Sequence, residues 1–181
     1  RLKYLLDRHV PFLSFGRPWG SSAEFANSYP WIDVDGASGT RDATKMFWKL
    51  GHRTIGFLGW KTTNPSPTKP KSVADDRLLG WSQTYAELKE SKAKKSPRDY
   101  SDLGDETIAS ARASAARLLA RHPDIEAIVC ASDTLALGAQ MEISSLKKNI
   151  PVSGFDNSPT SKVFNFSSLD QNISEVASLA L

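Results

Sequence analysis

The sequence has 181 residues, of which 40% are hydrophobic and 24% charged, a composition typical of a globular protein. Its net charge of +3 is too small to indicate that this chain binds nucleic acid itself. The single cysteine, Cys130, excludes an intramolecular disulfide and fits a reducing, cytoplasmic compartment, and no apolar run is long enough to indicate a membrane span.

Short apolar runs alternate with helical patterns along the chain, which is typical of repeated strand–helix units around a parallel sheet. The runs are nearly continuous, as expected for strands buried on both faces. The predicted strands are Pro11–Phe15, Trp31–Val34, Thr54–Gly59, Ala127–Ala131 and Ile150–Phe155, with Ser167–Leu169 as a short additional strand.

Between these strands, apolar residues recur at helical spacing. In the first such segment Ala43 and Phe47 lie on one stripe, and Gly51 follows as a residue suited to a left-handed helix end. Asp105 and Asp133 are the expected N-caps of two later helices, because a short acidic side chain accepts free backbone N–H groups. The predicted helices are Gly39–Leu50, Asp76–Lys89, Asp105–Arg121 and Thr134–Lys147.

Polar and aromatic residues gather where the predicted strands end. In open parallel sheets, ligands bind outside the carboxyl ends of the strands, so these positions are the candidate site. Carboxylates accept hydroxyl hydrogens, arginine donates in a fork, and aromatic faces cover the C–H surfaces of a sugar, so the composition predicts a polyol pocket. The exit positions are Gly16–Trp19, Asp35, Trp60, Ser132–Asp133 and Asp156–Asn157.

The sequence contains no arrangement typical of an enzyme or a metal site. His9, His52 and His122 have no convergent cysteine or paired carboxylates at ligand spacing. Cys130 lies within an apolar strand, where a buried, inert thiol is expected. There is no phosphate-binding loop, nucleophile elbow or dinucleotide fingerprint. We therefore expect no catalytic residue, no cofactor and no metal.

Seven strings follow one another along the chain: FGRPWG (15–20), PWIDVDGASGTRDAT (30–44), LGHRTIGFLGW (50–60), DDRLLGW (75–81), AIVCASDTLALGA (127–139), IPVSGFDNSP (150–159) and SSLDQ (167–171). In this order and at these intervals they resemble the LacI/GalR family of bacterial transcription regulators, in particular sugar-responsive members from actinobacteria. Each string is weak alone, but together they extend the resemblance over essentially the whole chain.

The resemblance implies an α/β, two-lobed, type I periplasmic-binding-protein-like fold with parallel sheets flanked by helices, incomplete at both ends. Residues 1–34 would be part of the N-terminal lobe, residues 35–169 the C-terminal lobe, and residues 170–181 a return to the N-terminal lobe. The DNA-binding headpiece would lie outside this chain.

The resemblance also implies ligand contacts. Asp156 matches a carboxylate that grips ligand hydroxyls, although such a residue can also cap its own turn. Arg77 matches an arginine that forks onto the ligand, with a surface salt bridge to a neighbouring aspartate as the alternative. Ser132 matches a polar contact, Asp133 is either a contact or only a helix cap, and Tyr100 matches a stacking aromatic.

Three further candidates come from their positions at strand exits. Trp60 and Trp19 are candidates to stack on a ligand, although a lone aromatic is more often a core residue. Arg17 could donate to a ligand or bridge loops. All three are predicted here as ligand-binding residues.

The implied function is effector sensing by a LacI-type regulator, in which a sugar closes the two lobes and changes operator affinity. The implied partners are a small-molecule effector, expected to be a sugar, operator DNA bound through a headpiece outside this chain, and a second copy in a homodimer. No membrane partner is expected. A periplasmic sugar-binding protein of an ABC transporter shares the fold and is the alternative, and an enzyme on a doubly wound sheet is a distant third.

Overall fold

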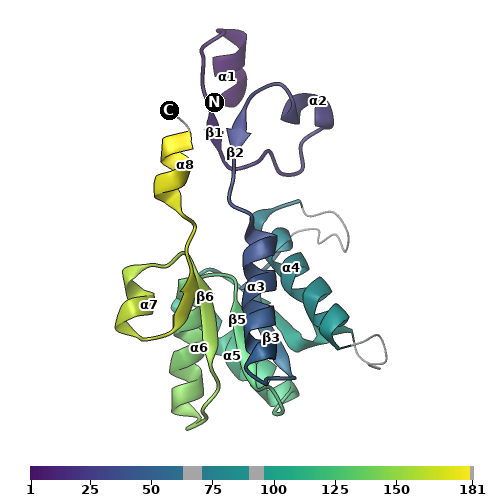
Figure 1. Ribbon diagram of the computed structural model, residues 1–181, viewed down its shortest axis with the longest axis vertical. Helices are drawn as coiled ribbons and strands as arrows, with labels where there is room; N and C mark the ends of the chain where they lie inside the picture. Colours follow the sequence, from purple (N-terminus) through teal and green to yellow (C-terminus); the bar gives the residue numbers. More distant parts are fainter. Residues whose placement is uncertain (63–70, 90–95, 180–181) are drawn as a thin grey trace. The chain divides into compact units, whose positions relative to one another are not determined.

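The computed structural model describes residues 1–62, 71–89 and 96–179. The chain divides into two compact units: unit 1 contains residues 1–35 and the segment from Asn172 onward, and unit 2 is Gly36–Gln171 (Figure 1). The chain therefore passes from one unit to the other after Asp35 and again after Gln171, whereas the sequence placed these borders after residues 34 and 169.

The described residues of unit 1 form a two-stranded parallel sheet and three short helices. The strands β1 (Ser14–Phe15) and β2 (Trp31–Ile32) are shorter than predicted. Directly after β2, the carboxylate of Asp33 accepts hydrogen bonds from Arg17 Nε, at 2.9 Å, and from the following backbone N–H. The helices are α1 (Leu2–Asp7), α2 (Ala23–Ala26) and α8 (Ile173–Leu179).

Unit 2 contains a five-stranded sheet in the order β4-β3-β5-β6-β7, and every neighbouring pair is parallel. The three interior strands β3, β5 and β6 consist almost entirely of buried residues, as the nearly continuous apolar runs predicted. The strands are β3 (Ile55–Trp60), β4 (Ser101–Gly104), β5 (Ala127–Cys130), β6 (Val152–Phe155) and β7 (Ser167–Leu169).

Helices cover both faces of this sheet. Gly154 faces Asp133 of α6, whereas its neighbour Phe155 faces Gly39 of α3. Because successive strand residues point to opposite faces, α3 and α6 lie on opposite sides. Helices α3 and α4 pack together (Figure 1), as do α5 and α6. The helical segments are α3 (Gly36–Lys49), α4 (Val73–Leu88), the 3₁₀ turn η1 (Pro97–Tyr100), α5 (Ile108–Arg121), α6 (Asp133–Ser145) and α7 (Pro159–Val163).

Helices α3 and α4 each begin three residues before the predicted start, and the caps of two later helices also differ from expectation. Gly51 adopts the predicted left-handed conformation after α3, with φ of 99°. The caps of α5 and α6, however, are Thr107 and Ser132 rather than Asp105 and Asp133. Each cap has an extended backbone, and its hydroxyl accepts the N–H three residues later, which places Asp133 within the first turn of its helix.

Strand β4 was not predicted, because its second residue is a buried aspartate rather than an apolar residue. Asp102 is 8% exposed and accepts hydrogen bonds from Arg117, at 2.6 Å, and Arg121, at 2.9 Å, both on α5. Charge pairing with the neighbouring helix therefore stabilises β4, as apolar burial stabilises β3 and β5. A search for apolar runs passes over such a strand.

We expect the free energy of unfolding to lose the contribution of Asp102 in acid. Burial alone would raise the pKa of this carboxyl, but hydrogen bonds from Arg117, Arg121 and Ser114 outweigh burial and hold the pKa below its usual range. A group with a lowered folded-state pKa stabilises the protein above its unfolded-state pKa, about 4 for aspartate, and loses that effect as the pH falls through the folded-state value. Urea unfolding of wild type and Asp102→Asn should therefore differ most at neutral pH and converge in acid. A gap that stays constant down to about pH 2 would contradict this.

Candidate functional site

The carboxyl ends of β3 and β5 lie side by side where the strand order of unit 2 reverses. From β3 the chain moves to β4 on one side, and it then crosses to β5 on the other. Connections that leave neighbouring strands in opposite directions open a crevice, and α/β proteins bind ligands there. Trp60 ends β3, and Ser132 follows β5 after one residue. Two of the predicted exit positions are therefore at the switch point.

The guanidinium group of Arg77 lies at the centre of this end of the sheet. Arg77 is on α4 and is 5% exposed. Its Cζ atom is 3.7 Å from the ring centroid of Phe155 and 5.3 Å from that of Trp60. Its Nη1 donates to the carbonyl oxygen of Ala131 and lies 3.7 Å from Oδ1 of Asp156. A guanidinium packed against aromatic rings loses little freedom when it binds a further oxygen, so this cluster is suited to a hydroxylated ligand.

Two glycines of α3 provide the space that this cluster occupies. A Cβ atom on Gly36 would lie 3.0 Å from Cγ of Arg77, and one on Gly39 would lie 2.5 Å from Cε2 of Phe155. Any larger residue at position 39 would therefore push the Phe155 ring away from its place against Arg77. The start of α3 thus determines where the arginine lies.

Asp156 follows β6 with an unusual backbone. Its φ is 111°, a conformation that L-residues other than glycine rarely adopt, and the next residue, Asn157, has φ of 46°. The loop is held by β7 itself, because Asp156 N–H donates to Leu169 O at 2.8 Å and Asn157 N–H donates to Ser168 Oγ at 2.9 Å. Strained backbone that neighbouring hydrogen bonds maintain is typical of functional sites.

The Asp156 side chain is directed to other side chains rather than to its own turn. Its Oδ1 accepts a hydrogen bond from Nε2 of Gln171 and faces Arg77, and about a third of the side chain (35%) is exposed. Burial raises the pKa of the carboxyl above its usual value, and Gln171 and the positive charge of Arg77 only partly offset that effect. Asp156 can therefore accept hydrogen bonds from ligand hydroxyls as well as from the protein.

Ser132 and Asp133 are buried and engaged within the protein. Ser132 Oγ accepts the N–H of Leu135, at 3.3 Å. Asp133 Oδ2 accepts both the N–H and the hydroxyl of Ser158, each at 2.7 Å, and its Oδ1 accepts the hydroxyl of Ser168 at 2.5 Å. Asp133 thus connects α6 to the loop after Asp156 and to β7. Both residues support the site, and their direct contact with a ligand stays a prediction.

Tyr100 is not brought together with the other candidates. It ends η1, directly before β4 begins at Ser101, so it lies at the amino ends of the parallel strands. The centroid of its ring lies 4.3 Å from that of the His122 ring and 5.9 Å from that of the Tyr85 ring. Because Trp60 and Asp156 lie at the carboxyl ends, the expectation that Tyr100 joins them is corrected. Tyr100 lies at the amino ends of the strands because it directly precedes β4, a strand that the sequence pattern did not predict.

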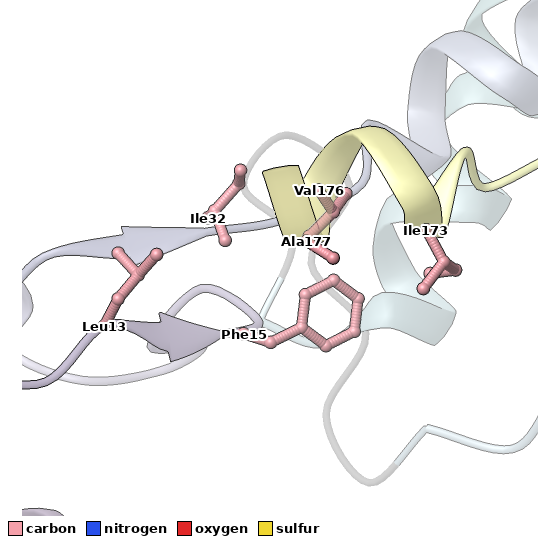
Figure 2. Close-up of a pocket in the computed structure, with 6 residues that line it drawn as sticks. All are labelled: Leu13, Phe15, Ile32, Ile173, Val176 and Ala177. Carbon is pink, nitrogen blue, oxygen red and sulfur yellow. The ribbon is translucent and has the colours of Figure 1, made fainter. Parts of the chain in front are cut away.

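Arg17 and Trp19 lie in unit 1 and contact each other. Arg17 Cζ is 4.4 Å from the Trp19 ring centroid, and Arg17 Nε is 2.9 Å from Asp33 Oδ2. This arrangement is the loop-bridging role considered as the alternative for Arg17. A hollow of about 250 Å³ in unit 1 is lined by hydrocarbon side chains and does not suit a sugar (Figure 2). Its lining residues are Leu13, Phe15, Ile32, Ile173, Val176 and Ala177.

Two site residues were not identified from the sequence as candidates. Phe155 reads as the last apolar residue of a strand, and nothing local indicates that its ring faces an arginine. Gln171 closes the string SSLDQ, so its position was noted but its bond to Asp156 was not foreseen. Among the described residues, no group of three histidine, cysteine, aspartate or glutamate side chains could hold a metal ion, and no helix is long and apolar enough to cross a membrane.

Comparison with known proteins agrees with this geometry. A family model for the periplasmic binding protein-like domain matches residues 44–181. The HTH-type transcriptional regulator CelR of Thermobifida fusca is 28% identical over 162 residues, which cover 87% of this chain and 44% of CelR. The regulator MalR of Streptococcus pneumoniae is 29% identical over 157 residues, 86% of this chain and 43% of MalR. A LacI-family regulatory protein from Chloroflexus aggregans has a solved structure with 28% identity and a TM-score of 0.78, over 99% of this chain and 61% of that one.

The chain belongs to the periplasmic binding protein-like domain family, and it is similar to LacI-type transcription regulators. The predicted α/β fold with parallel sheets flanked by helices is thereby confirmed. The chain spans less than half of the length of the two curated relatives, 44% and 43%. These relatives are transcriptional regulators, which does not favour the alternative of a transport binding protein.

Proposed function

We propose that this chain is the effector-sensing part of a LacI-type transcription regulator, and that its effector is a sugar. The observation that carries the proposal is the Arg77–Asp156 pair at the carboxyl ends of the strands, with Arg77 packed against Phe155 and Trp60. A solved structure with the same fold, 24% identical and with a TM-score of 0.77, is a complex of CelR with cellobiose, which supports a sugar as the ligand class.

The chemistry of the pair suits a neutral polyol. The carboxylate of Asp156 accepts hydrogens from ligand hydroxyls, and the guanidinium of Arg77 donates to ligand oxygens. The indole of Trp60 is partly exposed and offers an apolar face to sugar C–H groups. Ser132 caps α6 and Asp133 holds the loop after β6, so that the donor and the acceptor are fixed before the ligand arrives.

In the proposed regulator, unit 1 is part of the N-terminal lobe and unit 2 most of the C-terminal lobe. A sugar that binds one arrangement of the lobes more tightly than another shifts their populations by that difference in affinity. The shift then alters operator affinity through DNA-binding headpieces, which in this proposal belong to a cytoplasmic homodimer. Arg17 and Trp19 are the proposed ligand contacts of the N-terminal lobe.

Titration of the purified protein tests the proposal. We expect one member of a panel of mono- and oligosaccharides, cellobiose and lactose included, to bind measurably by calorimetry. Asp156→Ala should weaken the tightest of these sugars at least about tenfold, which is about 1.4 kcal/mol, because it removes a charged acceptor. Glu142→Ala is the matched control, since Glu142 pairs with Arg112 on a different part of the surface. Equal affinity in Asp156→Ala would refute the site, and a panel without any binding sugar would refute the ligand class.

A further inference from the structure

The place where the chain enters unit 2 and the place where it leaves unit 2 are both attached to the Arg77–Asp156 pair. The chain enters unit 2 at Gly36 and leaves it at Gln171. These positions are 135 residues apart in sequence numbering, from 36 to 171, yet each contacts one member of the pair or its immediate neighbour. The two attachments are described in turn.

The first attachment joins the start of α3 to α4. The backbone N–H of Ala37 donates to Oδ2 of Asp76 at 3.0 Å, and the hydroxyl of Thr40 donates to the carbonyl oxygen of Arg77 at 2.8 Å. Gly36 lies so close that a Cβ atom there would be 3.0 Å from both Arg77 Cγ and Asp76 Oδ2. The entry into unit 2 is therefore fixed to the residue that carries the guanidinium.

The second attachment joins the end of β7 to the loop after β6. Gln171 Nε2 donates to Asp156 Oδ1, and this is the same oxygen that lies 3.7 Å from Arg77 Nη1. One residue earlier, Asp170 Oδ2 accepts from Asn157 Nδ2 at 2.9 Å. The exit from unit 2 is therefore fixed to the carboxylate.

We infer that Gln171 is a positioning residue, which holds the Asp156 carboxylate against Arg77 and joins the pair to the exit of the chain from unit 2. This inference rests on the proposed function, because it takes the pair to be the sugar site. A ligand hydroxyl that donates to Asp156 Oδ1 shares that oxygen with the Gln171 amide. Ligand binding therefore changes how firmly residue 171 is held, while Asp76 and Ala37 keep the entry fixed to Arg77.

The alternative is that Gln171 belongs only to the connection that follows β7. Strand ends are commonly satisfied through backbone groups or water. Here the amide group of Gln171 instead donates to a carboxylate oxygen that also faces a buried guanidinium. A charge-assisted bond of this kind restricts the carboxylate more than a bond between neutral groups does. The geometry therefore points to positioning.

The test compares Gln171→Met with wild type. Methionine keeps the length of the side chain but lacks the amide group, and with it the donor to Asp156. Gln83→Met, at an exposed position on α4, removes the same group elsewhere and is the control. Without any ligand, carboxyl NMR titration should show a higher pKa for Asp156 in Gln171→Met than in wild type. The hydrogen bond from Gln171 favours the ionised carboxylate, and the variant lacks that bond. Exchange of the Asp156 backbone amide should accelerate about tenfold, since the loop is then held by fewer bonds.

The ligand arm uses the tightest sugar of the panel, with cellobiose as the first probe. We expect Gln171→Met to weaken its binding about threefold to tenfold, while Gln83→Met binds as wild type does. An Asp156 pKa and an amide exchange rate that match those of Gln83→Met would overturn the positioning role, as would unchanged sugar affinity. If instead both ligand-free changes occur but no sugar binds wild type, the positioning of Asp156 stands and the proposed sugar function fails.

Discussion

Replacement of Gly80 by alanine is expected to lower the free energy of unfolding by about 3 kcal/mol or more. A Cβ atom at this position would lie 2.1 Å from the carbonyl oxygen of Ala37 and 2.5 Å from Oγ1 of Thr40. The nearer atom belongs to the backbone of α3, so no rotamer change can relieve the overlap. The two helices would have to move apart, and with them the Gly36–Arg77 contact.

The matched control for Gly80→Ala is Gln83→Ala, an exposed position one turn further along the same helix. Alanine favours helices at both positions, and the control should change stability by less than about 0.5 kcal/mol. Urea unfolding of the two variants and wild type measures the difference. A Gly80→Ala protein as stable as wild type would mean that α3 and α4 do not approach as closely as the structure shows.

The sheet of unit 2 could be predicted wherever burial alone determines the strand. The segments around β3, β5 and β6 are continuous apolar runs, and the structure has strands within one or two residues of each prediction. Strand β4 escaped because Asp102 is stabilised by two arginines that are 15 and 19 residues further along the chain. Such pairing depends on the packing of α5, which a local pattern does not contain.

The candidate site could be predicted as a place more readily than as a set of contacts. The rule about strand ends correctly locates Trp60, Ser132 and Asp156 at the carboxyl ends of the strands. It does not show which acceptors are already used within the protein. Asp133 has the same chemistry as Asp156 and follows a neighbouring strand, yet Ser158 and Ser168 occupy both of its oxygens.

The arginine was a different case, because its position in the sequence does not follow a strand. Arg77 lies in the second turn of α4 and was identified only through the string DDRLLGW. Its place against Phe155 results from contacts across 78 positions, from residue 77 to 155, and from the space at Gly39. Neither is visible from hydrophobic periodicity, since both depend on how α3 and α4 lie on the finished sheet.

Arg77→Met should separate ligand affinity from fold stability. Methionine fills similar space against Phe155 and Trp60 but cannot donate, so we expect the affinity for the tightest sugar to fall about 100-fold, or about 3 kcal/mol. The free energy of unfolding should fall by only about 1 to 2 kcal/mol, mainly because the carbonyl of Ala131 loses its donor. The carboxylate of Asp156 is partly exposed and can be hydrated instead.

Calorimetric titration and urea unfolding of the same preparation measure both quantities for Arg77→Met. Arg117→Met is the matched control. It removes one of the guanidinium groups of α5 that pair with Asp102 of β4, and it should lower stability without changing sugar affinity. Binding within threefold of wild type in Arg77→Met would show that the guanidinium does not contact the ligand. In that case the sugar would be bound by the Asp156 carboxylate and the aromatic rings alone. The buried arginine would then serve only to hold the ends of β5 and β6 together.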